Sequence, residues 1–267
     1  MLSNLHTHTT FCDGKNTPEE VVLSALEKGF SAIGFSGHCN TFYDLSYCMT
    51  DVEGYKAEIK RLKEKYKKEI QVYLGIEEDM WAYAERSDYD YVIGSAHYIK
   101  HNSKYFSVDS GVDYVKRCLL EFNNDPLLMA ESYYKSFCEY LLKRKPDIAG
   151  HFDLLTKYDE TKDGGFFLCD KKYLALSEKY LKEAIKSEAI FEINAGAIAR
   201  GYRKTPYPAE NLLHILKKED AKVTISSDAH SADAIDFKFD DMKALLKDIG
   251  FQYTYTLYNN EFIKIPI

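Results

Sequence analysis

The sequence predicts an α/β fold built on a parallel sheet. Short apolar segments alternate with longer helical segments along the 267 residues, which is typical of parallel α/β proteins. Many of the apolar segments end in His, Asp or Glu, and the carboxyl ends of parallel strands carry the active site in such folds. We predict seven strands, at 2–7, 32–37, 71–77, 91–96, 147–150, 189–193 and 222–226.

The segments between the strands carry clear helix signals. TPEE at 17–20 combines an N-cap threonine, a proline at the first helical position and a capping-box glutamate, and Gly29 ends that helix. Thr50 and Glu53 repeat the capping-box spacing before a charged helix that we expect over 55–68. Further helices are expected from Asp125 to before Pro146 and near 171–187, 208–218 and 238–249, with one or two more strands in 251–267.

Composition excludes several classes of protein. Hydrophobic residues make up 45% of the chain, which is enough to form a core and excludes a disordered chain. The net charge of −7 argues against a general nucleic-acid binder. No apolar run is long enough for a transmembrane helix, and residues 1–6 lack a signal-peptide pattern. We therefore expect no nucleic-acid partner and no membrane association.

The chain has no internal repeat and no Gly-, Pro- or Ser-rich linker, so we expect a single domain over 1–267. Its six cysteines are scattered without a CxxC pair, which is too sparse for a disulfide scaffold. We expect these thiols to be free and the protein to be cytoplasmic. The sequence leaves the oligomeric state open.

The first strand carries His6 and His8 with one residue between them. Side chains at i and i+2 of a strand project from the same face, about 6.5–7 Å apart, so two imidazoles can converge on one cation. Asp228 and His230 repeat this spacing after the last predicted strand. Alone, a His-x-His pair is only moderately specific for a metal, and a structural pair of histidines is the more common explanation.

Other strand ends strengthen the metal interpretation. The complete set of candidate ligands is His6, His8, Asp13, His38, Glu77, His97, His151, Asp228 and His230. Nine ligands are too many for one ion and fit two or three. A nitrogen and oxygen set without thiolate suits Zn, Mn or Fe, and adjacent cations can activate a shared water for phosphoryl transfer. The alternative is a set of core histidines paired with carboxylates.

The segment HTHTTFCDGKNTPEEVVLSALEKGFSAIGFSGH at 6–38 resembles the opening of the polymerase and histidinol phosphatase (PHP) superfamily. Within that superfamily the chain is similar to the monofunctional histidinol-phosphatases. The supporting stretches are GIE at 75–77, YVIGSAH at 91–97, YFSVD at 105–109, GHFDL at 150–154, EINAG at 192–196, YP at 207–208 and SSDAH at 226–230.

The resemblance implies a distorted seven-stranded (β/α)7 barrel with three divalent metal ions at the C-terminal ends of the strands. Carried over by position, the first ion takes His6, His8, Glu77 and Asp228, the second takes Glu77 as a bridge with His97 and His151, and the third takes Asp13, His38 and His230. Every position of the family pattern is filled, which argues against an inactive member.

A phosphomonoester also needs positive charge from side chains, and the arginine fork matches phosphate oxygens. Arg200 follows the sixth strand, where resembling enzymes place a basic contact, and Lys157 and Arg203 are further candidates for substrate binding. The amine and imidazole of histidinol phosphate call for carboxylates and aromatic faces. Tyr43, Asp79, Trp81, Asp109 and Asp153 are unranked candidates for that role.

We interpret the chain as a metal-dependent phosphomonoesterase that hydrolyses L-histidinol phosphate, a small-molecule substrate, through a metal-bridging hydroxide. Asp228, His230 and Arg200 are the expected catalytic residues, and the identity of the general acid stays open. Ser36, Ser95 and Asn194 are candidates for orienting the ligands. The alternatives are a PHP-type phosphodiesterase or exonuclease, a phosphotyrosine-protein phosphatase and a metal-holding scaffold without activity.

Overall fold

A computed structural model describes residues 1–267 of the chain. Its centre is a seven-stranded parallel sheet in the order β1-β2-β3-β4-β7-β8-β9. The strands span Ser3–Asn4 (β1), Ala32–Phe35 (β2), Gln71–Asp79 (β3), Tyr91–Ser95 (β4), Ile148–Ala149 (β7), Ile190–Asn194 (β8) and Val223–Ser226 (β9). All seven predicted strands are therefore present, most of them a little shorter than expected.

The sheet curves until its two edges meet. Beyond β1 and β9, Thr7 and Ala229 form a parallel bridge. The His8 amide donates to the Ala229 carbonyl at 2.8 Å, and the Ala229 amide donates to the His6 carbonyl at 3.1 Å. These bonds close the barrel at its C-terminal end. The predicted distorted (β/α)7 barrel is confirmed.

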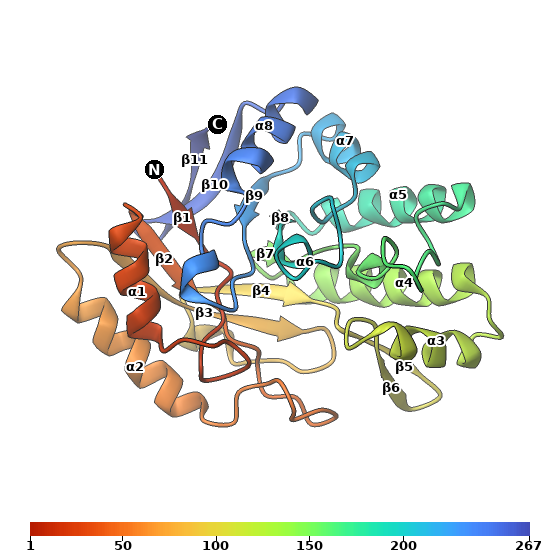
Figure 1. Ribbon diagram of the computed structural model, residues 1–267, viewed down its shortest axis with the longest axis horizontal. Coiled ribbons are helices and arrows are strands. Elements are labelled where there is room, and N and C mark those ends of the chain that lie inside the picture. Colours follow the sequence, from red (N-terminus) through yellow and green to blue (C-terminus); the bar gives the residue numbers. More distant parts are fainter.

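The helices pack around the outside of the sheet, with α1 and α2 on one side and α4 and α5 on the other (Figure 1). They span Pro18–Glu27 (α1), Val52–Lys65 (α2), Val112–Glu121 (α3), Pro126–Arg144 (α4), Lys171–Ile185 (α5), Gly196–Ala199 (α6), Glu210–Lys218 (α7) and Phe239–Ile249 (α8). Short 3-10 turns lie at Arg86–Asp88, Leu154–Thr156 and Ala232–Ala234. None of the helices combines the length and the hydropathy that crossing a bilayer requires.

The capping predictions for the first two helices had different outcomes. Thr17 and Glu20 form the predicted capping box before α1. At α2 the prediction of Thr50 as N-cap was wrong, because Asp51 caps the helix by accepting from the Gly54 amide at 2.9 Å. The helix therefore begins at Val52 and ends at Lys65, about one turn earlier at each end than expected.

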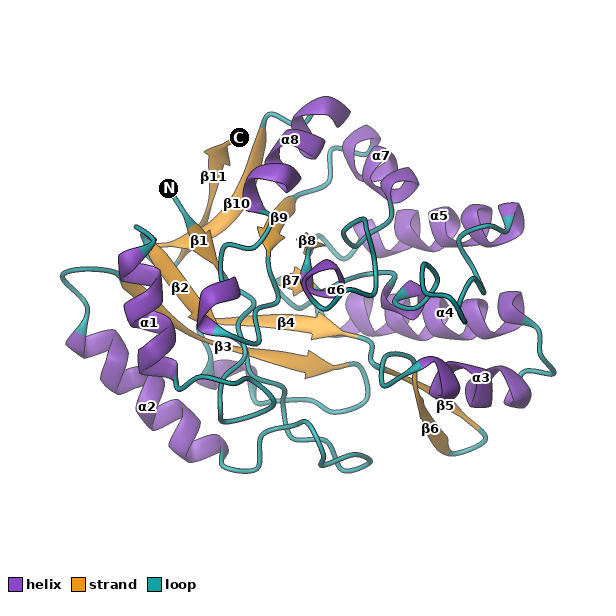
Figure 2. Cartoon of the chain, viewed as in Figure 1, coloured by secondary structure: helices purple, strands orange, loops and turns teal.

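Two hairpins lie outside the barrel sheet (Figure 2). The C-terminal hairpin of β10 (Tyr253–Tyr258) and β11 (Glu261–Pro266) supplies the extra strands expected in 251–267. Leu257 of β10 packs with Leu5 and Tyr91 in the buried cluster at the amino-terminal end of the barrel. The second hairpin, β5 (Tyr98–His101) with β6 (Lys104–Ser107), and α3 after it were not predicted.

Candidate metal centre

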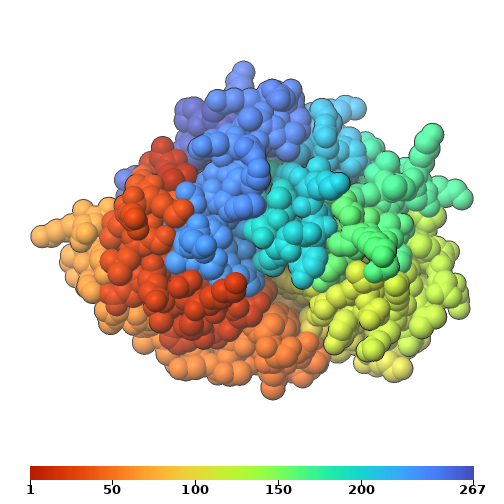
Figure 3. Space-filling model, in the orientation of Figure 1, coloured from red at the N-terminus to blue at the C-terminus, as the bar shows by residue number.

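The nine candidate ligands lie together at the C-terminal end of the barrel. The closing bonds between the ends of β1 and β9 bring the His6–His8 segment beside Asp228 and His230. Seven of the nine residues are buried, namely His6, His8, His38, Glu77, His97, His151 and Asp228. The side chains of Asp13 and His230 stay 34% and 23% exposed. Segments from many parts of the sequence meet at the centre of this face (Figure 3).

Glu77 of β3 lies at the middle of the group. Its Oε2 is 2.9 Å from His38 Nδ1 and 3.3 Å from His6 Nε2. Its Oε1 is 2.9 Å from His151 Nε2 and 3.3 Å from His97 Nε2. His8 Nε2 lies 3.5 Å from Oε2, so one carboxylate faces five imidazoles, three at Oε2 and two at Oε1, which suits a bridging ligand.

Ligand atoms of the group form four overlapping sets, each with its atoms within 4.8 Å of one another. The sets are His6 with His8 and Asp228, His6 with Glu77 and His151, His38 with Glu77 and His97, and Asp13 with His8, His38 and His230. These four sets agree only in part with the three ions that the resemblance implies. His8 also joins the set of Asp13, His38 and His230, and His97 and His151, implied as ligands of one ion, fall in different sets around Glu77.

Unpartnered atoms at the centre of the group test whether it fits metal ions. His6 Nε2, His8 Nε2 and Glu77 Oε2 are buried and lie close to carboxylate or imidazole groups, but none of these contacts has the geometry of a hydrogen bond. A buried polar atom left without a partner costs free energy, so such atoms call for a ligand. Imidazole nitrogens and carboxylate oxygens are donors that Zn, Mn and Fe accept. The residues present therefore fit divalent cations.

The electrostatics keep two of these groups, His8 and Asp228, in the forms that bind cations. At His6 and His97, by contrast, burial is outweighed by the surrounding carboxylates, which raise the pKa of both imidazoles, so that a cation would have to displace a proton there. Burial lowers the pKa of His8 to about 3, and the neighbouring His230 and His38 act in the same direction. Burial would raise the pKa of Asp228, but Arg200 and His6 outweigh it and hold that pKa well below its usual value. At neutral pH the metal-free site thus offers a neutral imidazole at His8 and a carboxylate at Asp228.

Comparison of the sequence with models of known protein families gives a match. The PHP domain model matches residues 4–196 of the chain. The chain belongs to the PHP domain family.

Among known proteins, this PHP domain is similar to the "Probable histidinol-phosphatase" of Schizosaccharomyces pombe, with 25% identity over 92% of this chain and 86% of that protein. It is 23% identical to the histidinol-phosphatase of Bacillus subtilis, over 88% of this chain and 96% of that protein. A crystal structure of the Lactococcus lactis histidinol phosphate phosphatase with zinc, L-histidinol and phosphate has the same fold, with a TM-score of 0.70, 21% identity and 98% coverage of both chains.

Buried carboxylates around the PHP site hold the candidate ligands in place. Glu192 of β8 accepts from His6 Nδ1 at 2.5 Å and from the His151 amide at 2.9 Å. Asp79 accepts from the His97 amide at 3.0 Å. Sequence reasoning left Glu192 without a role, although its place at a strand end was a signal that could have found it.

Of the three residues expected to orient ligands, Ser95 and Asn194 contact a candidate ligand side chain and Ser36 does not. Ser95 Oγ donates to Glu77 Oε1 at 2.7 Å. Asn194 Nδ2 contacts Asp228 Oδ2 at 3.4 Å, and it also donates to Glu192 at 2.9 Å. Ser36 Oγ instead accepts from the Thr7 amide at 3.1 Å, so its bond is to the backbone beside the ligands.

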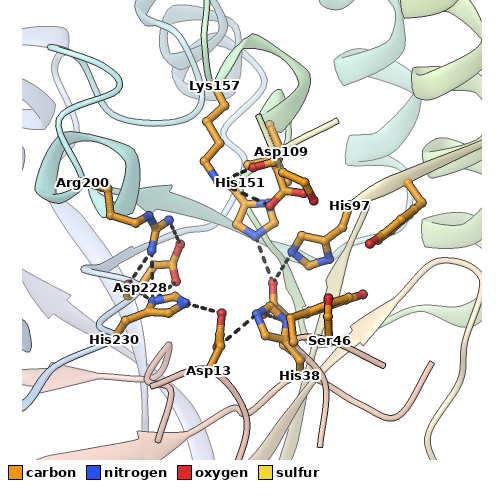
Figure 4. A pocket seen from close by; sticks show the side chains of 15 residues that line it. Asp13, His38, Ser46, His97, Asp109, His151, Lys157, Arg200, Asp228 and His230 are labelled. Carbon is orange, nitrogen blue, oxygen red and sulfur yellow. Dashed lines mark hydrogen bonds and ion pairs between the residues drawn. The ribbon is translucent and has the colours of Figure 1, made fainter. Parts of the chain in front are cut away.

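Of the three basic residues expected to bind the phosphate, two line the cavity and one does not. Arg200 and Lys157 line the same cavity of about 240 Å³ as most of the candidate ligands (Figure 4). Arg200 Nη2 is 3.0 Å from Asp228 Oδ2, and its Nη1 is 3.0 Å from His230 Nδ1. Arg203 does not line the cavity: its side chain is fully buried and donates to Thr156 Oγ1 at 2.6 Å.

Proposed function

We propose that this PHP domain is a phosphomonoesterase that hydrolyses L-histidinol phosphate to L-histidinol and inorganic phosphate. The observation that carries the proposal is one small cavity that joins a carboxylate and imidazole cluster to two cationic side chains, Arg200 and Lys157. The histidinol-phosphatases among its relatives, which match nearly the whole chain, support this choice of substrate.

We assign the nine residues from His6 to His230 named above as ligands of three divalent cations, of Zn, Mn or Fe. Glu77 would bridge the first two sites, since both of its oxygens face imidazoles, three at Oε2 and two at Oε1. Cations held by these residues would supply positive charge for the phosphate oxygens and would lower the pKa of a shared water, which would make that water a nucleophile toward phosphorus.

The side chains of the protein act on the phosphate and on protons. Arg200 offers a planar fork to the equatorial oxygens, where charge develops in the transition state. Its bonds to Asp228 and His230 fix the direction of that fork. Asp228 and His230 are therefore the residues that we expect to take part beside Arg200, and Lys157 adds a second positive charge from the other side of the cavity.

The test is phosphate release from L-histidinol phosphate, compared with an aryl phosphate and a dinucleotide diester, before and after chelation. The proposal predicts a strong preference for histidinol phosphate that chelation removes and that added metal restores. Faster cleavage of the diester would instead indicate a phosphodiesterase that acts on the ends of nucleic acids. Hydrolysis that persists in the fully chelated protein would contradict the metal-dependent reaction.

A further inference from the structure

A carboxylate in the cavity remains without a role after the metal ligands are assigned. Four carboxylates line this space, and three of them, Asp13, Glu77 and Asp228, belong to the candidate metal sets. The fourth is Asp109, two residues beyond β6, whose side chain is 23% exposed. It comes from the segment after the hairpin, which enters the mouth of the barrel from outside the sheet.

The other acidic candidates are already occupied elsewhere. Asp79 accepts from the Tyr43 hydroxyl at 2.6 Å and from the His97 amide at 3.0 Å, and it does not line the cavity. Asp153 is fully buried, accepts from the Ala209 amide at 2.9 Å and faces Arg203. Neither carboxylate can reach a ligand in the cavity without losing these partners.

Asp109 has both a fixed position and spare capacity. Its Oδ1 accepts from Ser107 Oγ at 3.1 Å, which orients the carboxylate. Its Oδ2 faces Lys157 Nζ at a loose 3.4 Å, while the same ammonium donates more closely to the Asp109 carbonyl at 2.9 Å. An ionised carboxylate can accept about four hydrogen bonds, so Asp109 can take a further cationic donor from a ligand.

The opposite wall offers a second unused group. Tyr47 lines the cavity, and its hydroxyl is buried without a hydrogen-bond partner. Its ring packs edge-on against His38 with ring centroids 4.8 Å apart, which holds it beside the candidate metal centre. Tyr98, which also lines the cavity, stacks on it with a centroid distance of 6.2 Å.

We propose that Asp109 binds the ammonium group of the substrate, with the Tyr47 hydroxyl as a second acceptor, while Lys157 turns toward the phosphate. The inference rests on the proposed function, because it needs a substrate that carries a phosphate and an ammonium on one short chain. On binding, the Asp109–Lys157 pair separates, and each member meets an opposite charge of the ligand. Asp109 thereby distinguishes amino-alcohol phosphates from phosphates that lack a cation.

The test compares L-histidinol phosphate with 3-(imidazol-4-yl)propyl phosphate, which lacks the amine. A charge-assisted hydrogen bond contributes about 1.5–3 kcal/mol, so Asp109→Asn should lower kcat/KM for histidinol phosphate roughly 10- to 100-fold, mainly through KM. The deamino analogue should change less than about threefold. Asp113→Asn, an exposed carboxylate at the start of α3, is the matched control. Tyr47→Phe should give a smaller loss with the same selectivity.

An equal loss for both substrates, or no loss for either, would overturn the role of Asp109 and leave the phosphatase assignment intact. A wild-type protein that hydrolyses neither imidazole phosphate, although it is folded and loaded with metal, would instead contradict the proposed function and this inference with it. Circular dichroism of Asp109→Asn checks that a loss for both substrates does not come from unfolding.

Discussion

At the scale of single residues, Arg200 is the group on which the phosphate proposal depends most. It lines the cavity and is tied to Asp228 and His230, so its guanidinium is already directed before a substrate binds. Removing one preorganised donor to a transition-state oxyanion costs about 100- to 1,000-fold in rate. We expect Arg200→Ala to lower kcat/KM for histidinol phosphate by that factor, measured by phosphate release. Arg61→Ala, on the exposed surface of α2, is the control.

We infer that Glu192 positions His6 rather than binding a metal itself. It accepts from His6 Nδ1, which leaves Nε2 of the same ring free for a cation. Loss of such a partner weakens metal binding about 10- to 100-fold. We expect that effect from Glu192→Gln, measured by competition with a chelator, and we expect excess metal to restore activity. The exposed Glu219→Gln should change neither quantity. Unchanged metal affinity in Glu192→Gln would refute the role.

At this scale the sequence predicted the nine candidate ligands and two side chains that contact them, Ser95 and Asn194, but not Glu192. The ligands stand at strand ends with short-range signals, such as the i and i+2 spacing of His6 and His8. The strand-end position of Glu192 was a local signal, but its bond to His6 spans 186 positions, so only the fold shows which ligand it holds. The direction of the Arg203 side chain likewise depends on Thr156 and Asp153, which only the folded loops bring near.

At the scale of elements, α2 offers a test of the corrected cap. The Asp51 side chain accepts from the Gly54 amide, whereas Thr50 lies outside the helix. Replacing a capping aspartate by alanine costs about 1 kcal/mol. Urea unfolding should therefore show Asp51→Ala less stable by about that amount, and Thr50→Ala nearly unchanged. The reverse order would restore Thr50 as the N-cap.

The strands of the barrel were predictable, whereas the insertion after β4 was not. Each barrel strand is a short apolar run between helical segments, and the structure buries nearly all of those residues. The β5–β6 hairpin pairs with no other strand and is only partly buried. Its sequence therefore carries a weaker pattern of apolar and polar residues than the barrel strands do. This hairpin leads into Asp109, which explains why the sequence alone could not rank the candidates for binding the substrate amine and imidazole.

At the scale of the whole molecule, the candidate metal centre also joins the two edges of the sheet. Ligands from the β1 end and from the β9 end meet where the barrel closes, with His8 Nε2 3.3 Å from Asp228 Oδ1. Cations bound there would stabilise the folded state by mass action. We expect chelation to lower Tm by roughly 5 to 15 °C. A Tm that does not change on chelation would mean that the centre holds no tightly bound ion.

The most direct test of the account is the metal content of the purified protein, measured by elemental analysis for the wild type and for Glu77→Gln. The assignment of the nine candidate ligands predicts about three ions per wild-type chain, and Glu77, whose two oxygens face five imidazoles, would bridge two of them. It also predicts that Glu77→Gln retains fewer ions and loses hydrolysis of histidinol phosphate. A wild type without bound metal that stays inactive when Zn, Mn or Fe is added, or a Glu77→Gln variant with full metal content and full activity, would contradict it.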